Sequence, residues 1–189
     1  MKPGIHRALL ASIGLLSASC LSSPTPNTAR LVRPALYPTA SEPRDERSAR
    51  LLAAHNRVRA DARVAPLRWD PYLAASAATY GPTLASLGRL VHSPRAPRPG
   101  QSENLWMGFR GAYSPEQMVG RWEAEKAYFR PGIYPHVSTT GNWYDVSHHT
   151  QVIWPGTTSV GCAIYASGKW DYLICRYSPK GNVDGQRVP

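Results

Sequence analysis

The apolar positions in the first part of the chain recur with the period of a helix. From near Asp45 or Ser48 to about Ala60, one face of the segment carries regularly spaced side chains, namely Leu51, Leu52, His55 and Val58. Residues three and four positions apart share a face of an α-helix, so this spacing predicts a first helix.

A second helix is expected after Asp70, whose carboxylate can accept hydrogen bonds from the free N–H groups of a first turn. Pro71 suits the first helical position, where no backbone donor is needed. Gly81-Pro82 then predicts a kink or a break, because proline cannot continue the hydrogen-bond ladder of a helix.

The clearest helix start in the chain lies at Ser114. Pro115 follows it, and Gln117 completes a capping box with proline at the first helical position. Beyond this start, one stripe of the expected helix carries Met118, Trp122, Glu125 and Phe129. The stripe is apolar except for its one carboxylate.

The last third of the chain has the composition of β-strands. Segments rich in Val, Ile, Thr, Tyr and Trp predict strands at 150–154, 160–165 and 170–177. Helices therefore precede strands, which favours an α+β fold over a doubly wound sheet. Cys162 and Cys175 stand one in each arm of the last hairpin, and an exported protein would keep such a pair oxidised as a disulfide.

Residues 1–20 have the pattern of a bacterial-type export signal, with basic residues, a short apolar run and small residues before Cys20. Residues 21–43 are rich in Pro, Ser and Thr and are expected to be a linker. Residues 44–182 are expected to form one domain and 183–189 a C-terminal tail. Cys20 is a candidate for attachment of a lipid anchor. The alternatives are that Cys20 is removed with the signal or that it remains as a free thiol. The protein is thus expected outside the cytoplasm: extracellular, periplasmic or anchored to a membrane by lipid.

The chain is basic, with a net charge of +10 at pH 7 from 22 Lys and Arg residues against 12 Asp and Glu residues. Such a surface suits an anionic lipid, a polysaccharide or a cell-wall polymer. Nucleic acid is not expected as a partner, because the basic residues are dispersed and the chain is expected to be exported. A monomer is expected.

Glu125 is a candidate site residue because a carboxylate on a buried stripe is costly unless a metal ion or a histidine pairs with it. An edge position that reaches water is the alternative. His148 and His149 open the expected strand at 150–154, where neighbouring side chains point to opposite faces. Only one of the two imidazoles is therefore expected in a site, and the spacing does not say which.

His92 and Glu103 bracket a proline-rich stretch that is expected to be a loop. By themselves, a histidine and a carboxylate in a loop say little about function. Their position becomes informative when the order of motifs along the whole chain is considered.

The chain resembles the CAP superfamily of cysteine-rich secretory, antigen 5 and pathogenesis-related class 1 proteins, as a bacterial exported member. The resemblance covers nearly all of residues 48–182. Its motifs, in order, are Ala54-His55-Asn56-Arg57-Val58-Arg59, Pro66-Leu67-Arg68-Trp69-Asp70, Val91-His92-Ser93, Glu103-Asn104-Leu105, Trp122-Glu123-Ala124-Glu125, the segment 148–154, and Gly181-Asn182. The resemblance implies a three-layer α-β-α sandwich with a mainly antiparallel central sheet.

The resemblance also implies a central cleft that holds a tetrad of His92, Glu103, Glu125 and His148, with His149 outside it. Family members usually have glycine at 147 and an aromatic residue at 149, so the chain departs from the pattern there. The two cleft imidazoles would bind a divalent metal, with zinc as the expected ion. If Glu103 and Glu125 act through water or hold the far nitrogens of the imidazole rings, the metal keeps open coordination positions and its affinity is modest. If the two carboxylates bind the metal directly, its affinity is higher.

Three functions fit these residues. The preferred one is a binding module for a lipid, a sterol or an anionic surface polymer. The second is a metal-dependent hydrolase or peptidase with Glu103 or Glu125 as general base, although neither His-Glu-x-x-His nor Gly-x-Ser-x-Gly is present. The third is a structural domain in which the tetrad is a hydrogen-bonded polar cluster.

Overall fold

A computed structural model describes residues 45–189, so the expected signal 1–20, its Cys20 and the linker 21–43 lie outside the described residues. The helices are α1 (Glu46–Asp61), α2 (Pro71–Ala78), α3 (Gly81–Leu87), α4 (Pro115–Glu123) and α5 (Ser147–Val152), with 3₁₀ helices η1 (Ala124–Tyr128) and η2 (Trp143–Val146). The strands are β1 (Arg68–Trp69), β2 (Ser102–Phe109), β3 (Gly132–Ile133), β4 (Ser159–Ser167), β5 (Trp170–Ser178) and β6 (Arg187–Val188). Within 45–189, no helix is both long and apolar enough to cross a membrane.

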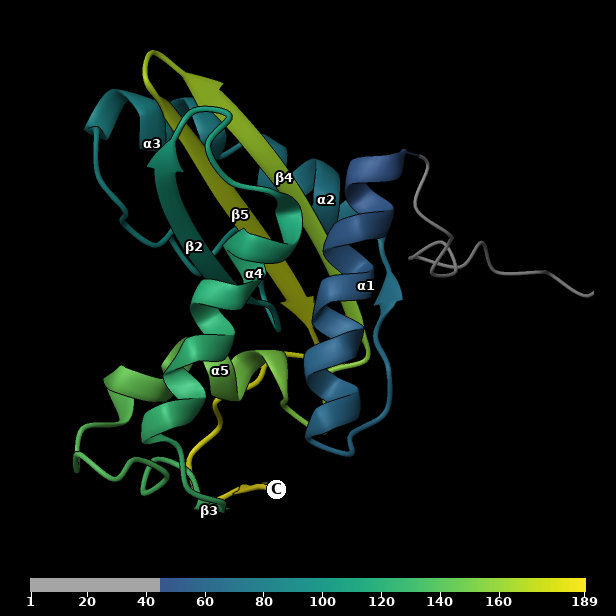
Figure 1. Ribbon diagram of the computed structural model, residues 1–189, viewed down its shortest axis with the longest axis vertical. Helices are drawn as coiled ribbons and strands as arrows, with labels where there is room; N and C mark the ends of the chain where they lie inside the picture. Colours follow the sequence, from purple (N-terminus) through teal and green to yellow (C-terminus); the bar gives the residue numbers. More distant parts are fainter. Residues whose placement is uncertain (1–44) are drawn as a thin grey trace, which may run out of the picture. The chain divides into compact units, whose positions relative to one another are not determined.

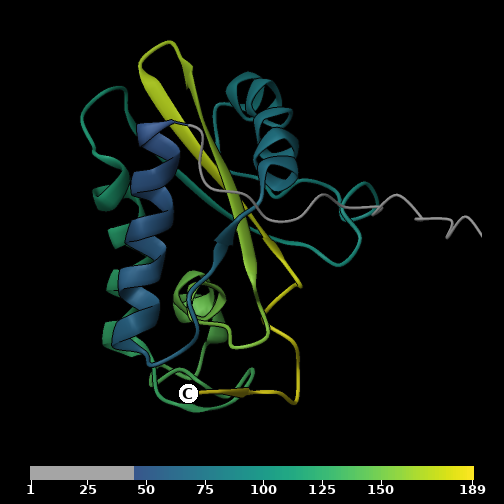
Figure 2. The same ribbon diagram turned by 90° about the vertical axis from the view of Figure 1, so that its right-hand side faces the viewer.

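The central sheet has the strand order β1-β4-β5-β2. β1 runs parallel to β4, whereas β4 and β2 both run antiparallel to β5. Figures 1 and 2 show α1 and α4 on one face of this sheet and α2 and α3 on the other. The expected α+β, three-layer α-β-α sandwich is therefore confirmed.

The side chains of β5 divide the interior into two cores. Leu173, Cys175 and Tyr177 belong to the larger core, which also contains buried residues of α1 and α4. Tyr172 and Ile174 point the other way and pack in the smaller core with residues of α2 and α3. This follows from the alternation of side chains along a strand, so each face of β5 supports a different helical layer.

The helix starts lie where the local signals place them. Asp45 caps α1, and Asp70 caps α2 by accepting from the backbone N–H groups of its first turn. Ser114 and Gln117 form the expected capping box of α4. The expected break at Gly81 separates α2 from α3, and an added methyl group there would overlap a side chain of β4.

The strand expected at 150–154 is wrong, because the segment Ser147–Val152 is the helix α5. The carboxylate of Glu125 accepts hydrogen bonds from the backbone nitrogens of His148 and His149, at 2.9 and 3.0 Å. An acceptor at this helix start satisfies donors that have no partner within the helix, and it outweighs the β-propensity of the segment. The two histidines are thus separated by about 100° of helical rotation and not by strand alternation.

The expected loop around Glu103 is also wrong in part, because this residue lies on β2. The pairing of β2 with β5 sets Glu103 opposite Arg176 and Asn104 opposite Cys175. Helices cover both faces of the sheet, so the strand lacks the simple apolar–polar alternation of a half-exposed strand.

The segment 183–189, expected to be a tail, is packed onto the domain. β6 pairs with β3, with Val188 opposite Gly132. The side chain of Val188 has no exposed surface and belongs to the larger core. The compact domain therefore extends beyond the expected limit at residue 182.

The expected disulfide is confirmed: Cys162 and Cys175 are directly opposite in the β4–β5 register and are bonded to each other. Both are buried. The bond fixes the register of this hairpin, and a loop of this size is worth about 3 kcal/mol in the chain-entropy account.

Candidate functional site

The four expected site residues form two imidazole–carboxylate pairs. Nδ1 of His92, in the loop after α3, lies 3.0 Å from Oε1 of Glu103 on β2. Nδ1 of His148, in α5, lies 2.6 Å from Oε1 of Glu125 in η1. Each histidine is thus held by a carboxylate from a different element of the fold.

Glu103 is enclosed on all sides, and its side chain has no exposed surface. Besides His92, the backbone nitrogen and the hydroxyl of Ser93 donate to it, at 2.9 and 2.8 Å. Burial alone would raise the pKa of Glu103, but the hydrogen bonds from His92 and Ser93, with the charge of Arg98, lower it below its usual value. Glu103 is therefore an ionised carboxylate whose oxygens are already engaged.

Two buried arginines support this carboxylate through Ser93. Arg98 donates from Nε to the Ser93 hydroxyl at 2.7 Å, and Arg176 donates to the same oxygen from Nη2 at 3.3 Å. Arg176 also forms an ion pair with Glu103, with 3.5 Å between Nε and Oε2, and it donates to the hydroxyl of Ser76 on α2. These positive charges compensate a carboxylate that would otherwise be costly to bury.

Glu125 has two functions at once. Its Oε1 atom holds the ring of His148, and its Oε2 atom accepts from the backbone nitrogens that open α5. The same side chain therefore positions the helix and orients the imidazole on it.

The other end of α5 is held by Arg59 of α1, which has no exposed surface. Its Nη1 atom donates to the carbonyl oxygens of Val152 and Trp154, at 2.8 and 2.9 Å. Burial lowers the pKa of Arg59 to about 10, so the group still carries its charge at neutral pH. A cation at the C-terminal end of a helix also interacts favourably with the helix dipole.

The tautomers of the two cleft histidines follow from their partners. An ionised carboxylate only accepts hydrogen bonds, so Nδ1 of His92 and of His148 carries the hydrogen. Within residues 45–189, the hydrogen bonds of both rings are made by Nδ1, and neither Nε2 atom has a hydrogen-bond partner. In the neutral ring with its hydrogen on Nδ1, Nε2 carries the lone pair. Orientation of a metal-binding histidine by a carboxylate on its far nitrogen is a common arrangement in metal sites.

A cleft of about 870 Å³ connects the two pairs. Its lining includes three of the four residues, His92, Glu103 and His148, and also Arg95, Lys180, Tyr134, Trp143 and Tyr144. Glu125 is not part of the lining and acts on the cleft through His148. A larger cavity of about 1130 Å³ lies at the N-terminal ends of α1 and α4 and contains no member of the tetrad.

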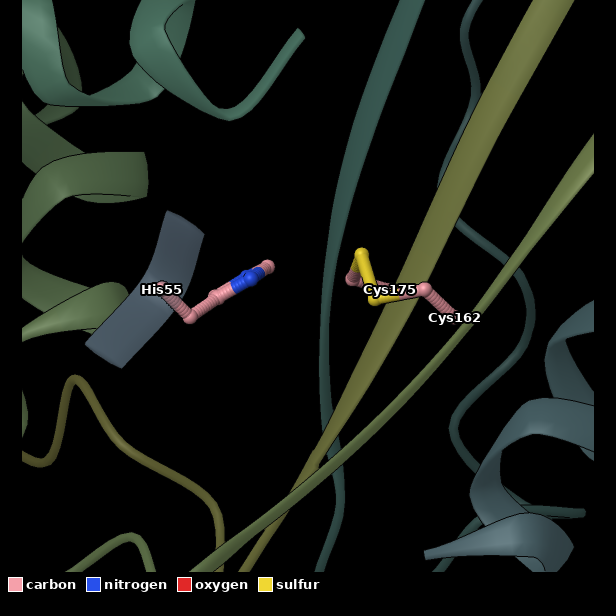
Figure 3. Close-up of side chains that lie close together, drawn as sticks. All are labelled: His55, Cys162 and Cys175. Atoms are coloured by element: carbon pink, nitrogen blue, oxygen red, sulfur yellow. A yellow bond between two sulfur atoms is a disulfide. The ribbon is translucent and has the colours of Figure 1, made fainter. Parts of the chain in front are cut away.

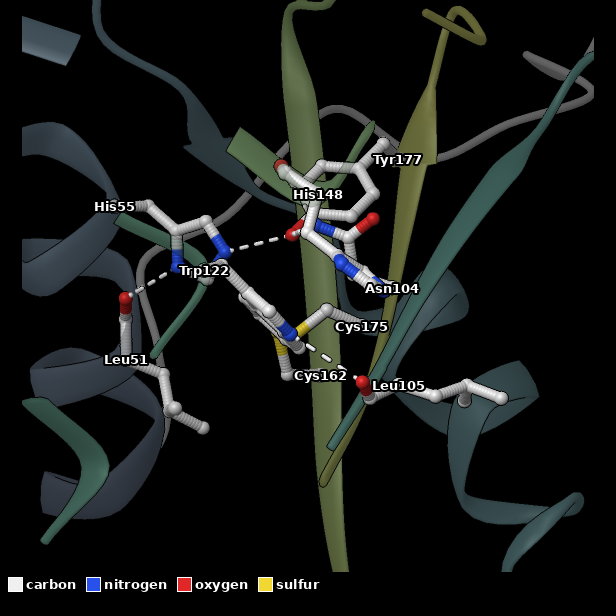
Figure 4. Close-up of a disulfide and its surroundings, with 9 residues drawn as sticks. All are labelled: Leu51, His55, Asn104, Leu105, Trp122, His148, Cys162, Cys175 and Tyr177. Atoms are coloured by element: carbon white, nitrogen blue, oxygen red, sulfur yellow. Dashed lines mark hydrogen bonds between the residues drawn. A yellow bond between two sulfur atoms is a disulfide. The ribbon is translucent and has the colours of Figure 1, made fainter. Parts of the chain in front are cut away.

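The tetrad does not form a compact set of metal ligands by itself. Within residues 45–189, three metal-ligating side chains come within 4.8 Å of one another at His55, Cys162 and Cys175. Figure 3 shows the imidazole of His55 reaching from α1 toward the two cysteines, whose sulfur atoms are bonded to each other. Figure 4 adds the surrounding hydrogen bonds, which link His55 to Leu51 and Tyr177.

The donor chemistry of the cleft nevertheless fits a metal ion. The two free Nε2 atoms belong to residues that line one cleft, and each ring is fixed by a carboxylate. His92 and His148 would be the direct ligands, while Glu103 and Glu125 orient them.

His149 lies outside the cleft and inside the core. Its side chain is buried against Phe129, with 5.3 Å between the ring centres. Burial lowers the pKa of His149 to about 4, despite the opposing charge of Glu125, so the ring is neutral at neutral pH.

Sequence reasoning missed the residues that hold the tetrad in place. The missed residues are Arg59, Ser93, Arg98, Asn104, Arg176 and Asn182. Asn104 donates to the backbone oxygen of His148, and Asn182 donates to that of Ser147, so both tie α5 to its surroundings. The motifs of the resemblance contain Arg59, Ser93, Asn104 and Asn182 and were the available signal for these four residues, whereas Arg98 and Arg176 lie outside those motifs.

The sandwich with a histidine-lined cleft defines the class of protein, and comparison with known families agrees. Residues 52–177 match the model of CAP, the cysteine-rich secretory protein family. The chain belongs to this family.

Several curated relatives are pathogenesis-related proteins of plants. Pathogenesis-related protein 1C of Nicotiana tabacum is 40% identical over 138 residues, which cover 71% of this chain and 76% of the relative. Pathogenesis-related protein 1 of Arabidopsis thaliana is 33% identical over 137 residues, covering 72% of this chain and 78% of the relative.

Solved structures show the same fold at lower identity. The structure of NaASP2 with Zn²⁺ has a TM-score of 0.64 at 22% identity and covers 78% of this chain and 88% of its own. Schistosoma mansoni venom allergen-like protein 4 has a TM-score of 0.57 at 18% identity and covers 77% of this chain and 97% of its own.

Proposed function

We propose that this chain is an exported binding module whose cleft holds a divalent metal ion, zinc by its donor set, on His92 and His148. The observation that carries the proposal is that a carboxylate holds Nδ1 of each ring, while neither Nε2 atom has a hydrogen-bond partner among residues 45–189. Two imidazole ligands suit zinc and leave positions open for water or a ligand. When bound, the ion would supply a positive charge that polarises a ligand oxygen. The solved neighbour NaASP2 contains Zn²⁺, which supports the choice of metal.

We further propose that the ligand carries an anionic group beside an apolar body, as an anionic lipid does. Arg95 and Lys180 are exposed on the lining of the cleft, in a chain with a net charge of +10. Trp143 and Tyr144 also line it and are 42% and 58% exposed. Exposed aromatic rings next to cationic groups suit a molecule with both characters. A sterol would use the aromatic rings without the cationic groups, and an anionic polymer would use the cationic groups without the rings.

The alternative of a metal-dependent hydrolase or peptidase has less support from the geometry. A general base must be within reach of an attacking water molecule. The side chain of Glu103 has no exposed surface, and both oxygens of Glu125 are engaged with α5 and its histidine.

Calorimetric titration with zinc tests the metal site. The oxidised full chain should carry Cys20→Ser, so that no free thiol competes for the ion. We expect saturable binding of one ion, weakened at least about tenfold by His92→Gln or by His148→Gln. Glutamine can still donate to the carboxylate, so the substitution removes mainly the Nε2 ligand.

The matched control for the zinc titration is His136→Gln, at an exposed histidine outside the cleft lining. This variant should bind zinc like the parent. Absence of binding by the parent, or binding that survives unchanged in both cleft variants, would contradict the metal proposal.

Vesicle co-sedimentation tests the ligand class. We expect binding to vesicles with anionic lipid, weaker binding to neutral vesicles with or without sterol, and loss of binding when Arg95→Glu and Lys180→Glu are combined. The control combines Arg68→Glu and Arg89→Glu, which change the same charge at exposed positions outside the described cavities. Binding to a soluble anionic polymer alone would identify the polymer as the ligand, and binding to sterol vesicles alone a sterol. Binding to none of them would contradict the ligand proposal.

A further inference from the structure

His55, Cys162 and Cys175 form a second cluster of ligating side chains, separate from the cleft. A ring nitrogen of His55 and the two sulfur atoms lie within 4.8 Å of one another. All three residues are buried, with exposed fractions of 0%, 5% and 0%. Figure 3 shows that they come from facing layers, His55 from α1 and the cysteines from β4 and β5. None of them lines the cleft.

The hydrogen bonds of His55 fix which nitrogen can bind a metal. Nδ1 lies 2.7 Å from the backbone oxygen of Leu51, and a carbonyl oxygen only accepts, so Nδ1 carries the hydrogen. Nε2 lies 2.9 Å from the hydroxyl of Tyr177, which must then donate to it (Figure 4). Nε2 therefore presents a lone pair. A ring N–H held by a backbone carbonyl is the usual orientation of a metal-ligating histidine.

We propose that, when the disulfide is reduced, Cys162, Cys175 and His55 form a buried three-ligand site for a soft divalent ion such as zinc. Two thiolates and one imidazole are a common zinc donor set, and three protein ligands leave one position open. The cysteines face each other across β4 and β5, so their sulfur atoms stay on the same face of the sheet after reduction. The metal ion and the disulfide are alternative cross-links at the same place.

The chemistry of the exchange balances with simple reagents. A phosphine reduces the disulfide by taking oxygen from one water molecule, which yields two thiols and the phosphine oxide. Zinc then binds and displaces both thiol protons. A small-molecule disulfide reverses the process: it oxidises the two zinc-bound thiolates to the Cys162–Cys175 bond, leaves as two thiolates, and frees the zinc ion.

The site has a use in a chain that passes from a reducing to an oxidising compartment. Before oxidation, a metal ion would tie α1 to the β4–β5 hairpin, which the disulfide alone does not do. After oxidation, the disulfide keeps the hairpin in register, and the hydroxyl of Tyr177 donates a hydrogen bond to Nε2 of His55.

Cobalt is a suitable probe, because its bonds to thiolates give a charge-transfer band in the near ultraviolet. The full chain with Cys20→Ser is reduced with a phosphine and titrated with Co²⁺. We expect a saturable band at one ion per chain that zinc abolishes, and no band in the oxidised protein. The cleft has no sulfur ligand, so cobalt bound there gives no such band, and the result is independent of the proposed cleft metal.

Two histidine variants test the ligand set. His55→Gln should weaken cobalt binding at least about tenfold, because a direct ligand is lost. His149→Gln is the matched control, since it makes the same change at another buried histidine that is not a member of the cluster. It should leave the band and the affinity unchanged.

Far-UV circular dichroism is recorded in the same titration, because it shows whether the reduced chain is folded. A folded, reduced chain without the band, or an unchanged affinity in His55→Gln, would overturn it. If the reduced chain unfolds, zinc should restore its structure, because binding energy at such a site is also folding energy. A reduced chain that stays unfolded with zinc would overturn the proposal as well.

Discussion

Two buried histidines should make the domain lose stability on mild acidification. Burial lowers the pKa of both His55 and His149 to about 4, from a usual value of 6.5. Below about pH 6.5, each ring of the unfolded chain takes up a proton, whereas the folded chain keeps both rings neutral until about pH 4. The unfolded state then binds more protons, so the free energy of unfolding falls as the pH drops through this window.

The size of the effect follows from the two pKa values of each ring. At about pH 5, the linkage relation gives a loss of about 2 kcal/mol for each histidine relative to about pH 7.5, or about 4 kcal/mol for both. This is a large share of the 5–15 kcal/mol typical of a folded domain. Glu103, whose pKa is lowered, adds its own loss of stability at lower pH, below its usual value of 4.5.

Urea denaturation at several pH values between about 5 and 7.5 measures the effect. His55→Gln and His149→Phe should each reduce the pH dependence by about half, whatever they do to stability at neutral pH. His136→Gln is the control, because this histidine is exposed and should leave the dependence unchanged. An unfolding free energy that is flat over this range, or a pH dependence that survives in both variants, would refute the assignment of two neutral buried rings.

Three further predictions concern stability. Replacing Cys162 and Cys175 together by Ala should lower the free energy of unfolding by about 3 kcal/mol, measured by denaturant unfolding. A clearly smaller loss would contradict the account in which the disulfide stabilises the domain by restricting the unfolded chain. Glu103→Gln should cost about 3 kcal/mol by leaving buried arginine charge uncompensated, whereas Glu116→Gln, at an exposed ion pair, should cost at most about 1 kcal/mol in the same denaturation assay. Gly161→Ala should cost about 1–3 kcal/mol, because the added methyl group would overlap backbone atoms of α2, and an unchanged melting temperature would exclude this overlap.

Structure that depends on neighbouring residues was predictable from the sequence. The capping box at Ser114 and the cap at Asp70 are complete within a few residues, so their pattern determines where α4 and α2 begin. The disulfide could be predicted as well, because Cys162 and Cys175 stand at matching positions of one hairpin.

Structure that depends on distant residues was not predictable in this way. The helix at 147–152 needs the carboxylate of Glu125, which lies more than twenty residues earlier and looks like part of an apolar stripe. The burial of Glu103 likewise depends on Arg98 and Arg176, whose charges look like surface positions in the sequence. The family motifs located the tetrad, but no local pattern explains what holds it.

The two glutamates of the tetrad serve the folding of the domain as well as its site, because Glu125 holds the start of α5 and Glu103 neutralises buried arginines. Natural selection for a folded domain would therefore preserve both carboxylates even in a lineage that no longer binds any ligand. The Nε2 atoms of His92 and His148 are different, because no hydrogen bond within the described residues 45–189 uses them. Among related proteins, loss of histidine at positions 92 or 148 is thus the informative sign that binding has been abandoned, whereas retention of the glutamates is not a sign that it persists.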